Sequence, residues 1–255
     1  RIFVQQERVM CDFNTADSWV ILSPIEQSIK RKIEAVGIPL KDWDINIYRG
    51  VLTGCNEAFI INSTKRKEIL ANCQSAEEKE RTEELIRPIL RGKDIKRYGY
   101  VDNGRYLINT HNGVKGKIPR VDINDYPAVK AHLDQFWDKI SKRSDKGDTP
   151  YNLRNCAYLE DFNKPKVMWK IIGCNINFCF DENRLICNNA VDIMVGKKDY
   201  LIQFVGLMNS KLFDWYLKLT TEAEVQGGGI QLYVTTLEKT LLKLDFPSSL
   251  TEVVY

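Results

Sequence analysis

The sequence is poor in the residues that bind transition metals. It has only two histidines, His111 and His132, and none of its seven cysteines forms a Cys-x-x-Cys pair. Structural zinc sites usually join four such ligands at short spacings, so we expect no metal site. The odd number and irregular spacing of the cysteines favour reduced, buried thiols, which are typical of a cytoplasmic protein.

Long apolar runs are also absent. No run reaches the roughly 18–20 residues that a membrane-spanning helix needs, so we expect no membrane partner. The opening residues, RIFVQQERVMCDF, contain no apolar signal core and do not begin with methionine. We therefore interpret the sequence as an internal segment of a longer chain. Its 255 residues can bury one large core or two small ones.

Motifs for catalysis are missing as well. The sequence has no Gly-x-Ser-x-Gly, no His-Glu-x-x-His and no Gly-Lys-Ser/Thr phosphate loop, and GGGI at 227–230 follows an expected helix rather than a strand. It also lacks the Asn/Asp-Pro-Pro-aromatic loop and the glycine-rich loop of DNA amino-methyltransferases. Glu78-Lys79-Glu80 and Glu238-Lys239 lie in polar helical contexts, unlike the carboxylates of a metal-dependent nuclease. We therefore expect no catalytic residues in these 255 positions.

The hydrophobic pattern predicts helices and strands in groups. Helices are expected at 24–36, at 126–143, at 199–219, at about 235–243, and as one or two polar helices within 63–90 that Pro88 interrupts. Strands are expected at 45–50, 57–62, 105–110, 166–172, 176–180 and 189–195. Because strands are grouped rather than alternating with helices, the pattern predicts an α+β fold with a twisted mixed or antiparallel sheet and packed helices.

Positive charge is concentrated in one stretch of a nearly neutral chain. The net charge is +3, but residues 87–120 hold nine Lys and Arg against two Asp, and residues 77–84 hold five Glu against two basic residues. A basic stretch of this density indicates a surface for a polyanion. A solvated surface with scattered ion pairs explains the charge equally well.

Two motifs in the first half of the sequence resemble the TaqI-like C-terminal specificity domain. GVLTGCNEAFII at 50–61 matches the opening signature of that family through Gly50, Thr53, Gly54, Asn56, Ala58 and Phe59. IRPILRGKDIKRYGY at 86–100 is similar to the next element through Pro88, Gly92, Asp94, Ile95 and Tyr98.

Further elements resemble the family in the same order. They are YPAVKAHLDQFWDKISKRSDKG at 126–147, FNKPKVMW at 162–169, VGLMNSKLFDWYLK at 205–218, which contains Asn209, and DFP at 245–247. Tyr151 departs from the pattern, because the family often has tryptophan there. The resemblance extends over about residues 20–247.

The resemblance implies a module that recognises double-stranded DNA by sequence. It implies that residues 1–44 form a linker and connecting helix, residues 45–197 a target recognition domain, and residues 198–255 a helical segment packed on it. The parent chain is expected to be a Type IIG restriction-modification enzyme or an adenine-specific DNA methyltransferase, that is, a site-specific adenine methyltransferase with or without a fused endonuclease. Its upstream methyltransferase domain would use S-adenosylmethionine, and no cofactor is expected in this segment. Structural roles are implied for Gly50, Thr53, Gly54, Asn56, Phe59, Gly92 and Asn209.

Candidate DNA contacts lie in three polar loops, at 111–120, 142–155 and 226–231. Lys and Arg suit phosphates, whereas Arg, Asn and Gln suit base edges. The candidates are Asn112, Lys115, Lys117, Arg120, Lys142, Arg143, Lys146, Asn152, Arg154 and Gln231. Arg143 suits a structural ion pair equally well.

Two other functions are compatible with the sequence. Helices 24–36 and 199–219 fit a protein-docking module, in which the basic loops are incidental. A nuclease or transferase domain with an unrecognised site is the second alternative.

Overall fold

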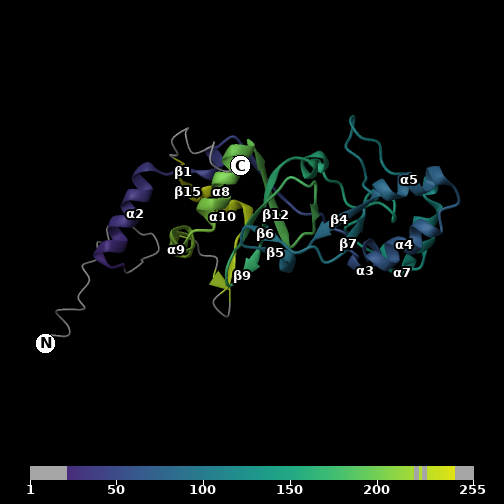
Figure 1. Ribbon diagram of the computed structural model, residues 1–255, viewed down its shortest axis with the longest axis horizontal. Coiled ribbons are helices and arrows are strands. Elements are labelled where there is room, and N and C mark those ends of the chain that lie inside the picture. Colours follow the sequence, from purple (N-terminus) through teal and green to yellow (C-terminus); the bar gives the residue numbers. More distant parts are fainter. Residues whose placement is uncertain (1–21, 221–223, 226–228, 245–255) are drawn as a thin grey trace.

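The computed structural model describes residues 22–220, 224–225 and 229–244, and it is elongated (Figure 1). A four-stranded antiparallel sheet lies at its centre in the order β10-β8-β12-β2. The strands are β2 (Ile45–Arg49), β8 (Lys166–Lys170), β10 (Phe178–Asp181) and β12 (Val191–Gly196). Both inner strands are rich in apolar residues, which is the pattern of strands buried on both faces.

Each face of the central sheet belongs to a different hydrophobic core. Successive side chains point to opposite faces, so Met168 and Ile193 enter the first core, whereas Val167, Trp169 and Met194 enter the second. The central sheet is therefore the partition on which both cores rest.

The first core extends to a second sheet and a helical end. Strands β3 (Ile60–Asn62), β4 (Ile86–Leu90), β7 (Arg105–Ile108) and β11 (Ile186–Cys187) pair in the order β11-β4-β7-β3, with only the β11–β4 pair parallel. Helices α3 (Asn56–Phe59), α4 (Ser63–Ala71), α5 (Ala76–Leu85), α6 (Pro127–Asp134) and α7 (Trp137–Ile140) form this end with the 3-10 turn η3 (Ile123–Asp125).

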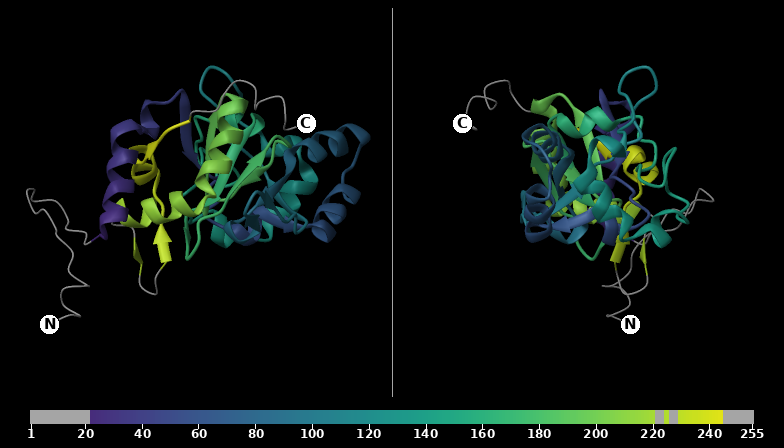
Figure 2. Two further views of the ribbon diagram at one scale, coloured as in Figure 1. Left: turned by 60° about the vertical axis from the view of Figure 1, so that its left-hand side comes forward. Right: turned by 90° about the vertical axis from the view of Figure 1, so that its right-hand side faces the viewer.

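The second core is closed by the C-terminal segment. Helices α8 (Lys198–Met208) and α9 (Lys211–Thr220) lie between the sheet and α2 (Pro24–Val36), as Figure 2 shows. The remaining helix is α10 (Val234–Lys239).

The remaining strands form three small sheets. Strand β14 (Gly229–Gln231) pairs with β13 (Glu224–Val225) and β9 (Ile172–Gly173), β1 (Ile38–Pro39) pairs with β15 (Leu241–Leu242), and β5 (Ile95–Lys96) pairs with β6 (Gly99–Tyr100). The other 3-10 turns are η1 (Leu40–Asp42), η2 (Gly92–Asp94) and η4 (Leu159–Asn163).

The expected α+β class is confirmed, with one mixed and several antiparallel sheets. The helix at 24–36 is confirmed too, although none of its residues is buried. The expected division at residues 44 and 197 stays a prediction. Leu40 is fully buried in the second core, so the segment before residue 45 packs on the body of the protein.

Several expected elements differ in detail. Residues 56–59 form α3 before the strand begins, and Pro88 lies inside strand β4 rather than in a helix. Pro88 lies one residue before the pairing with β11 begins, at Ile89. The expected helix at 126–143 is split between α6 and α7, and the one at 199–219 is split at Asn209. Asn209 ends α8 while its side chain donates to the carbonyl of Phe178 at 2.8 Å and accepts from its N–H at 3.0 Å.

A buried ion pair joins two neighbouring strands of the central sheet. Lys166 and Asp181 are fully buried and pair with each other through β8 and β10. The ammonium of Lys166 also donates to the carbonyl of Phe162 at 2.8 Å, and Asp181 accepts from the N–H of Leu185 at 3.1 Å. The pair therefore fixes the turn after β10 as well as the two strands.

A second buried carboxylate, Asp192, has no such cation in contact. One of its oxygens has no hydrogen-bond partner among the described residues, and its strand neighbours are Trp169 and Arg49. Burial raises the pKa of Asp192 to about 7, although the charge of Arg49 opposes that shift. Folding therefore favours the protonated acid.

Removing one partner of the Lys166–Asp181 pair should destabilise the fold. Lys166→Met leaves a carboxylate buried without its cation, and we expect a loss of about 3–5 kcal/mol in the free energy of unfolding. The double variant Lys166→Met/Asp181→Leu should lose clearly less. Urea denaturation measures both, and a single variant as stable as the wild type would contradict the ion pair's role.

Asp192→Asn should stabilise the protein in a pH-dependent manner. The pKa of Asp192 is higher in the folded than in the unfolded chain, so its contribution to stability is full below about pH 4 and is lost as the pH rises through about 7. We expect the Asp192→Asn variant to have a higher melting temperature than the wild type near pH 8 and nearly the same one near pH 4. A difference that does not vary with pH would show that ionisation of Asp192 is not the cause.

Candidate nucleic-acid interface

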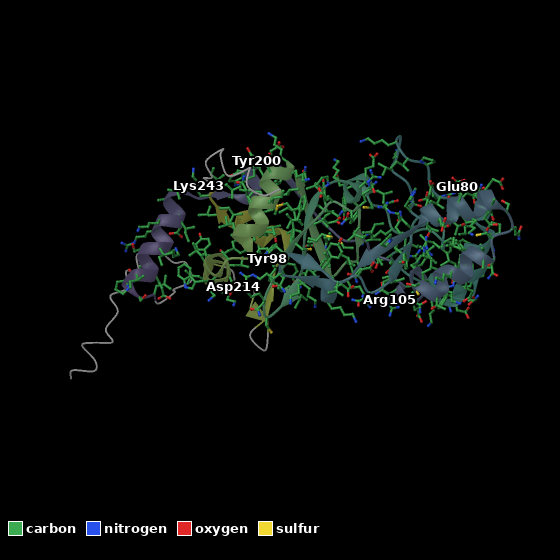
Figure 3. The ribbon with its side chains drawn as sticks, in the orientation of Figure 1. Glu80, Tyr98, Arg105, Tyr200, Asp214 and Lys243 are labelled. Atoms are coloured by element: carbon green, nitrogen blue, oxygen red, sulfur yellow. The ribbon has the colours of Figure 1, made fainter. Side chains whose placement is uncertain are left out.

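A groove of about 810 Å³ opens where several strands of the two sheets end. It lies beside Arg49 at the end of β2, Lys170 at the end of β8, and the residues that precede β12. Its lining includes five cations and three amides and no carboxylate: Arg49, Arg91, Lys93, Lys96, Lys170, Asn177, Asn189 and Gln231. We call these eight side chains the basic groove. Tyr98, two residues beyond Lys96, lies near the middle of the molecule between Asp214 and Glu80 (Figure 3).

Two glycines of the family motifs let the walls of the basic groove approach. A Cβ on Gly50 would lie 2.1 Å from the carbonyl oxygen of Asn188, which no real side chain tolerates. A Cβ on Gly92 would lie 3.2 Å from the carbonyl oxygen of Ala190. These contacts bring Arg49 and the 91–93 segment against residues 188–190, and they give both glycines a structural role.

Most of the cations in the basic groove have no anionic partner. Arg91 is the exception, because its guanidinium contacts the carboxylate of Asp94 at 3.0 and 3.2 Å. Burial opposes ionisation of Asp94, but hydrogen bonds from Arg91 and Asn103 outweigh it and keep the pKa of Asp94 below its usual value. Arg49, Lys93, Lys96 and Lys170 form no ion pair with any residue that the structure describes.

A smaller pocket of about 270 Å³ continues the basic groove. Both are lined by Arg49 and Asn189, and the smaller one adds residues 50–52, 154–156 and Tyr158. Arg154 forms an ion pair with Asp145 at 3.1 Å. The structure therefore places two of the predicted contacts, Arg154 and Gln231, along this continuous surface.

The predicted loop at 111–120 forms a tight projection. Gly113 and Gly116 have φ values of +73° and +74°, and Lys115 and Lys117 are exposed on it. Asn112 and Arg120 join this loop to the neighbouring one by contacting Asp148, the latter at 3.4 Å. The two loops are thus tied together, with two free-standing lysines at the tip.

In the loop at 142–155, Lys142 and Lys146 are exposed. The ammonium of Lys146 donates to the carbonyl of Ser141 at 2.9 Å, so it reaches back to the end of the preceding helix. These two lysines do not line the basic groove. Gln226, which the third loop also offered, lies outside the described residues.

Arg143 has a structural position, which removes it from the candidate interface. Its side chain is 7% exposed and donates to the carbonyls of Thr53, Asp145, Pro150 and Asn152. The guanidinium also lies 4.5 Å from the ring centre of Phe59. Arg143 was predicted either to contact DNA or to form an ion pair. Its guanidinium instead hydrogen-bonds to four backbone carbonyls.

Asn152 is likewise turned inward. It is 1% exposed, and its amide donates to the carbonyl of Val121 at 3.0 Å. It therefore holds the 111–121 loop in place instead of facing a ligand.

The signature at 50–61 is locked to this same region. Gly54 has a φ of +65°, and a Cβ there would lie 3.0 Å from Asp145. The hydroxyl of Thr53 donates to Asn56 at 2.6 Å, and Phe59 is fully buried under Arg143. The signature at 50–61 and the loop at 142–155, which are about 90 residues apart in the sequence, thus form one structural unit.

Sequence reasoning missed most of the basic groove. Arg91, Lys93 and Lys96 were visible only as part of the basic stretch, and Arg49, Lys170, Asn177 and Asn189 gave no local signal. Other members of the stretch are structural: Arg87 donates to the carbonyl of Arg184, and Arg97 donates to the carbonyl of Asn209 at 2.7 Å.

Neither a metal centre nor a membrane helix is found in the described segments. Within residues 22–220, 224–225 and 229–244, no three His, Cys, Asp or Glu side chains come together as metal ligands. None of the helices there is long and apolar enough to cross a membrane.

Comparison with known proteins matches this architecture. The type IIG restriction endonuclease BpuSI superposes with a TM-score of 0.53 at 13% identity, covering 89% of this chain and 27% of that one. The type IIL restriction-modification enzyme MmeI, solved in complex with DNA, superposes with a TM-score of 0.57 at 13% identity, covering 84% and 27%. At this identity the likeness shows a shared fold, and the chain spans about a quarter of the length of each enzyme.

The family comparison goes further, because it rests on the sequence. The TaqI-like C-terminal specificity domain matches residues 87–240, which is more than half of the chain. The resemblance noted in the sequence motifs is thereby confirmed over residues 87–240. The chain belongs to the family of TaqI-like C-terminal specificity domains and is a DNA sequence-recognition module.

Proposed function

We propose that this module holds double-stranded DNA against the basic groove, with the loop at 111–121 as a second contact. The observation that carries the proposal is the lining of the groove, which combines four cations that have no ionic partner among the described residues with three amides and no carboxylate. Phosphates attract the cations from any sequence, whereas the amides can hydrogen-bond only to matching base edges. One surface thus offers both the affinity and the selectivity that recognition needs.

The two lysines at the tip of the loop complete the proposed contact. Lys115 and Lys117 are exposed and form no ion pair with described residues. The loop is fixed at its base by the contacts of Asn112 and Arg120 with Asp148. A loop held in this way presents charge without losing much conformational entropy when it binds.

The chemistry is proposed to reside elsewhere in the parent chain. We propose an adenine-specific methyltransferase of the restriction-modification kind, with or without a fused endonuclease, whose upstream domain binds S-adenosylmethionine. The module supplies the position of the DNA, and that domain supplies methyl transfer. The family membership and the absence of catalytic motifs from the sequence support this division.

A second contact surface supports the upstream domain as partner. The helix α2 exposes Ile25 and Val36 at 73% and 56%, and Leu212 on α9 is 47% exposed. An apolar pocket of about 230 Å³ lies between α2, α9 and β15. We propose that the methyltransferase domain of the same chain covers it, so that protein docking accompanies DNA recognition rather than replacing it.

Removing lysines from the basic groove should weaken DNA binding uniformly. In Lys93→Ala/Lys96→Ala/Lys170→Ala, the slope of log affinity against log salt should become shallower by roughly 0.9 for each phosphate that is no longer neutralised. Fluorescence anisotropy with unrelated duplexes across a salt series measures this. Lys41→Ala/Lys67→Ala/Lys79→Ala removes equal charge outside the groove and is the matched control. Equal slopes for the two triple variants would contradict the proposed surface.

Charge reversal at the loop tip should separate DNA binding from protein docking. We expect Lys115→Glu/Lys117→Glu to weaken DNA binding several-fold at low salt, because two phosphate contacts become repulsive. Binding to the separately produced upstream domain should be unchanged. If the variant loses the protein contact and keeps its affinity for DNA, the loop belongs to a docking surface instead.

A further inference from the structure

The amides of the basic groove form no side-chain hydrogen bond within the described part of the chain, whereas two buried amides elsewhere are engaged. Asn152 and Asn209 are buried and hydrogen-bonded to the backbone. Asn189 and Gln231 have no side-chain hydrogen bond to any described residue, although both line a groove whose rim is cationic. Polar groups that the fold does not use, on a surface that attracts polyanions, are candidates for reading a ligand.

Both amides are carried on backbone that is hydrogen-bonded to neighbouring segments. Asn189 belongs to a turn that is fixed by a hydrogen bond from the N–H of Val191 to the carbonyl of Asn188 at 2.9 Å. Gln231 lies in strand β14 and pairs with Ile172. Side chains on a fixed backbone can hold the geometry that a bidentate contact requires.

Ile171 holds together the two backbone segments that carry the amides. The N–H of Ile171 donates to Ala190, next to Asn189, at 3.1 Å, and its carbonyl accepts from Leu232, next to Gln231, at 2.8 Å. Paired strands are about 4.8 Å apart, so the two backbones are at most about 10 Å apart. Nucleotides rise about 3.4 Å along one DNA strand, so this distance equals about three base-pair steps.

The chemistry of the two amides favours one base. An Asn or Gln amide matches adenine in the major groove, donating to N7 and accepting from N6, whereas cytosine is read by a carboxylate, which the lining lacks. We infer that Asn189 and Gln231 are specificity-determining residues that each read an adenine, and that the recognised sequence contains two A·T pairs within about three base-pair steps. This inference rests on the proposed binding of DNA in the basic groove.

Selection from a duplex pool with a randomised central segment tests the assignment. The 255-residue chain should enrich sequences with two A·T positions at that spacing. Asn189→Ala and Gln231→Ala should each abolish the preference at one of the two positions. Discrimination at that position should fall by about 5- to 150-fold, the value of one bidentate pair. Gln135→Ala, at the end of α6 and away from the groove, is the matched amide control and should leave the selection unchanged.

A variant that changes the preferred base gives a stricter test than a variant that only loses the preference. Gln231→Glu keeps the shape of the side chain but can accept from the amino group of cytosine, so the preferred base at that position should change from adenine to cytosine. Overall affinity should fall, because a carboxylate then faces the phosphates. Thermal melting checks that each variant is folded.

The outcomes separate the inference from the function on which it rests. Absence of DNA binding by the wild-type chain at low salt overturns the proposed function. Binding without an A·T preference, or variants that keep the wild-type preference, overturns the reading role of Asn189 and Gln231 and leaves the DNA-binding surface in place.

Discussion

The close approach of the backbone at Gly50 and Gly92 is the constraint on which the surface depends. The missing side chains let the end of β2 and the segment after β4 lie against residues 188–190. Both sheets meet there, since β2 belongs to the central sheet and β4 to the mixed one. A Cβ at Gly50 would overlap the carbonyl of Asn188, and separation of these segments would part the cations on one wall of the groove from the amide on the other. The two glycines thus shape the proposed binding surface through the backbone contacts that they allow.

Polar side chains are hydrogen-bonded in the buried frame, which is formed by the strands and the loops packed on them, but several on the surface of the basic groove are not. Inside the protein, Arg143 meets four carbonyls, and Lys166 meets a carboxylate and a carbonyl. Buried charges require such partners because desolvation is otherwise too costly. In the basic groove, Lys170 and Asn189 have no side-chain partner among the described residues, but Lys170 is half-buried and Asn189 exposed, so solvent can reach them and that cost does not arise. The same residue types therefore stabilise the fold in one place and remain available in another.

The class of fold and the family could be predicted from the sequence, because hydrophobic periodicity and the order of motifs are read directly from it. The helix at 24–36 and the strands at 166–172 and 189–195 followed from local pattern alone. The groove did not, because Arg49, Lys170 and Asn189 are far apart in the sequence and meet only through strand pairing. Arg143 shows the converse limit: an arginine in a polar loop resembles a DNA contact until its burial is known. The composition of a loop is a poor guide to exposure when the backbone of that loop surrounds one of its own side chains, as it does Arg143.

On the proposed binding mode, one set of buried residues could support surfaces that read different DNA sequences. Asn189 and Gln231 contribute no side-chain hydrogen bonds to the described fold, so changing them alters what the groove presents at little structural cost. Replacing Arg143, Asn152 or Asn209 would instead leave several backbone groups without partners. The fold shared with BpuSI and MmeI at 13% identity fits this arrangement, since the strand frame persists while most side chains differ. In the proposed binding mode, selectivity resides in a few side chains at the ends of strands, and affinity in lysines around them that carry no sequence information.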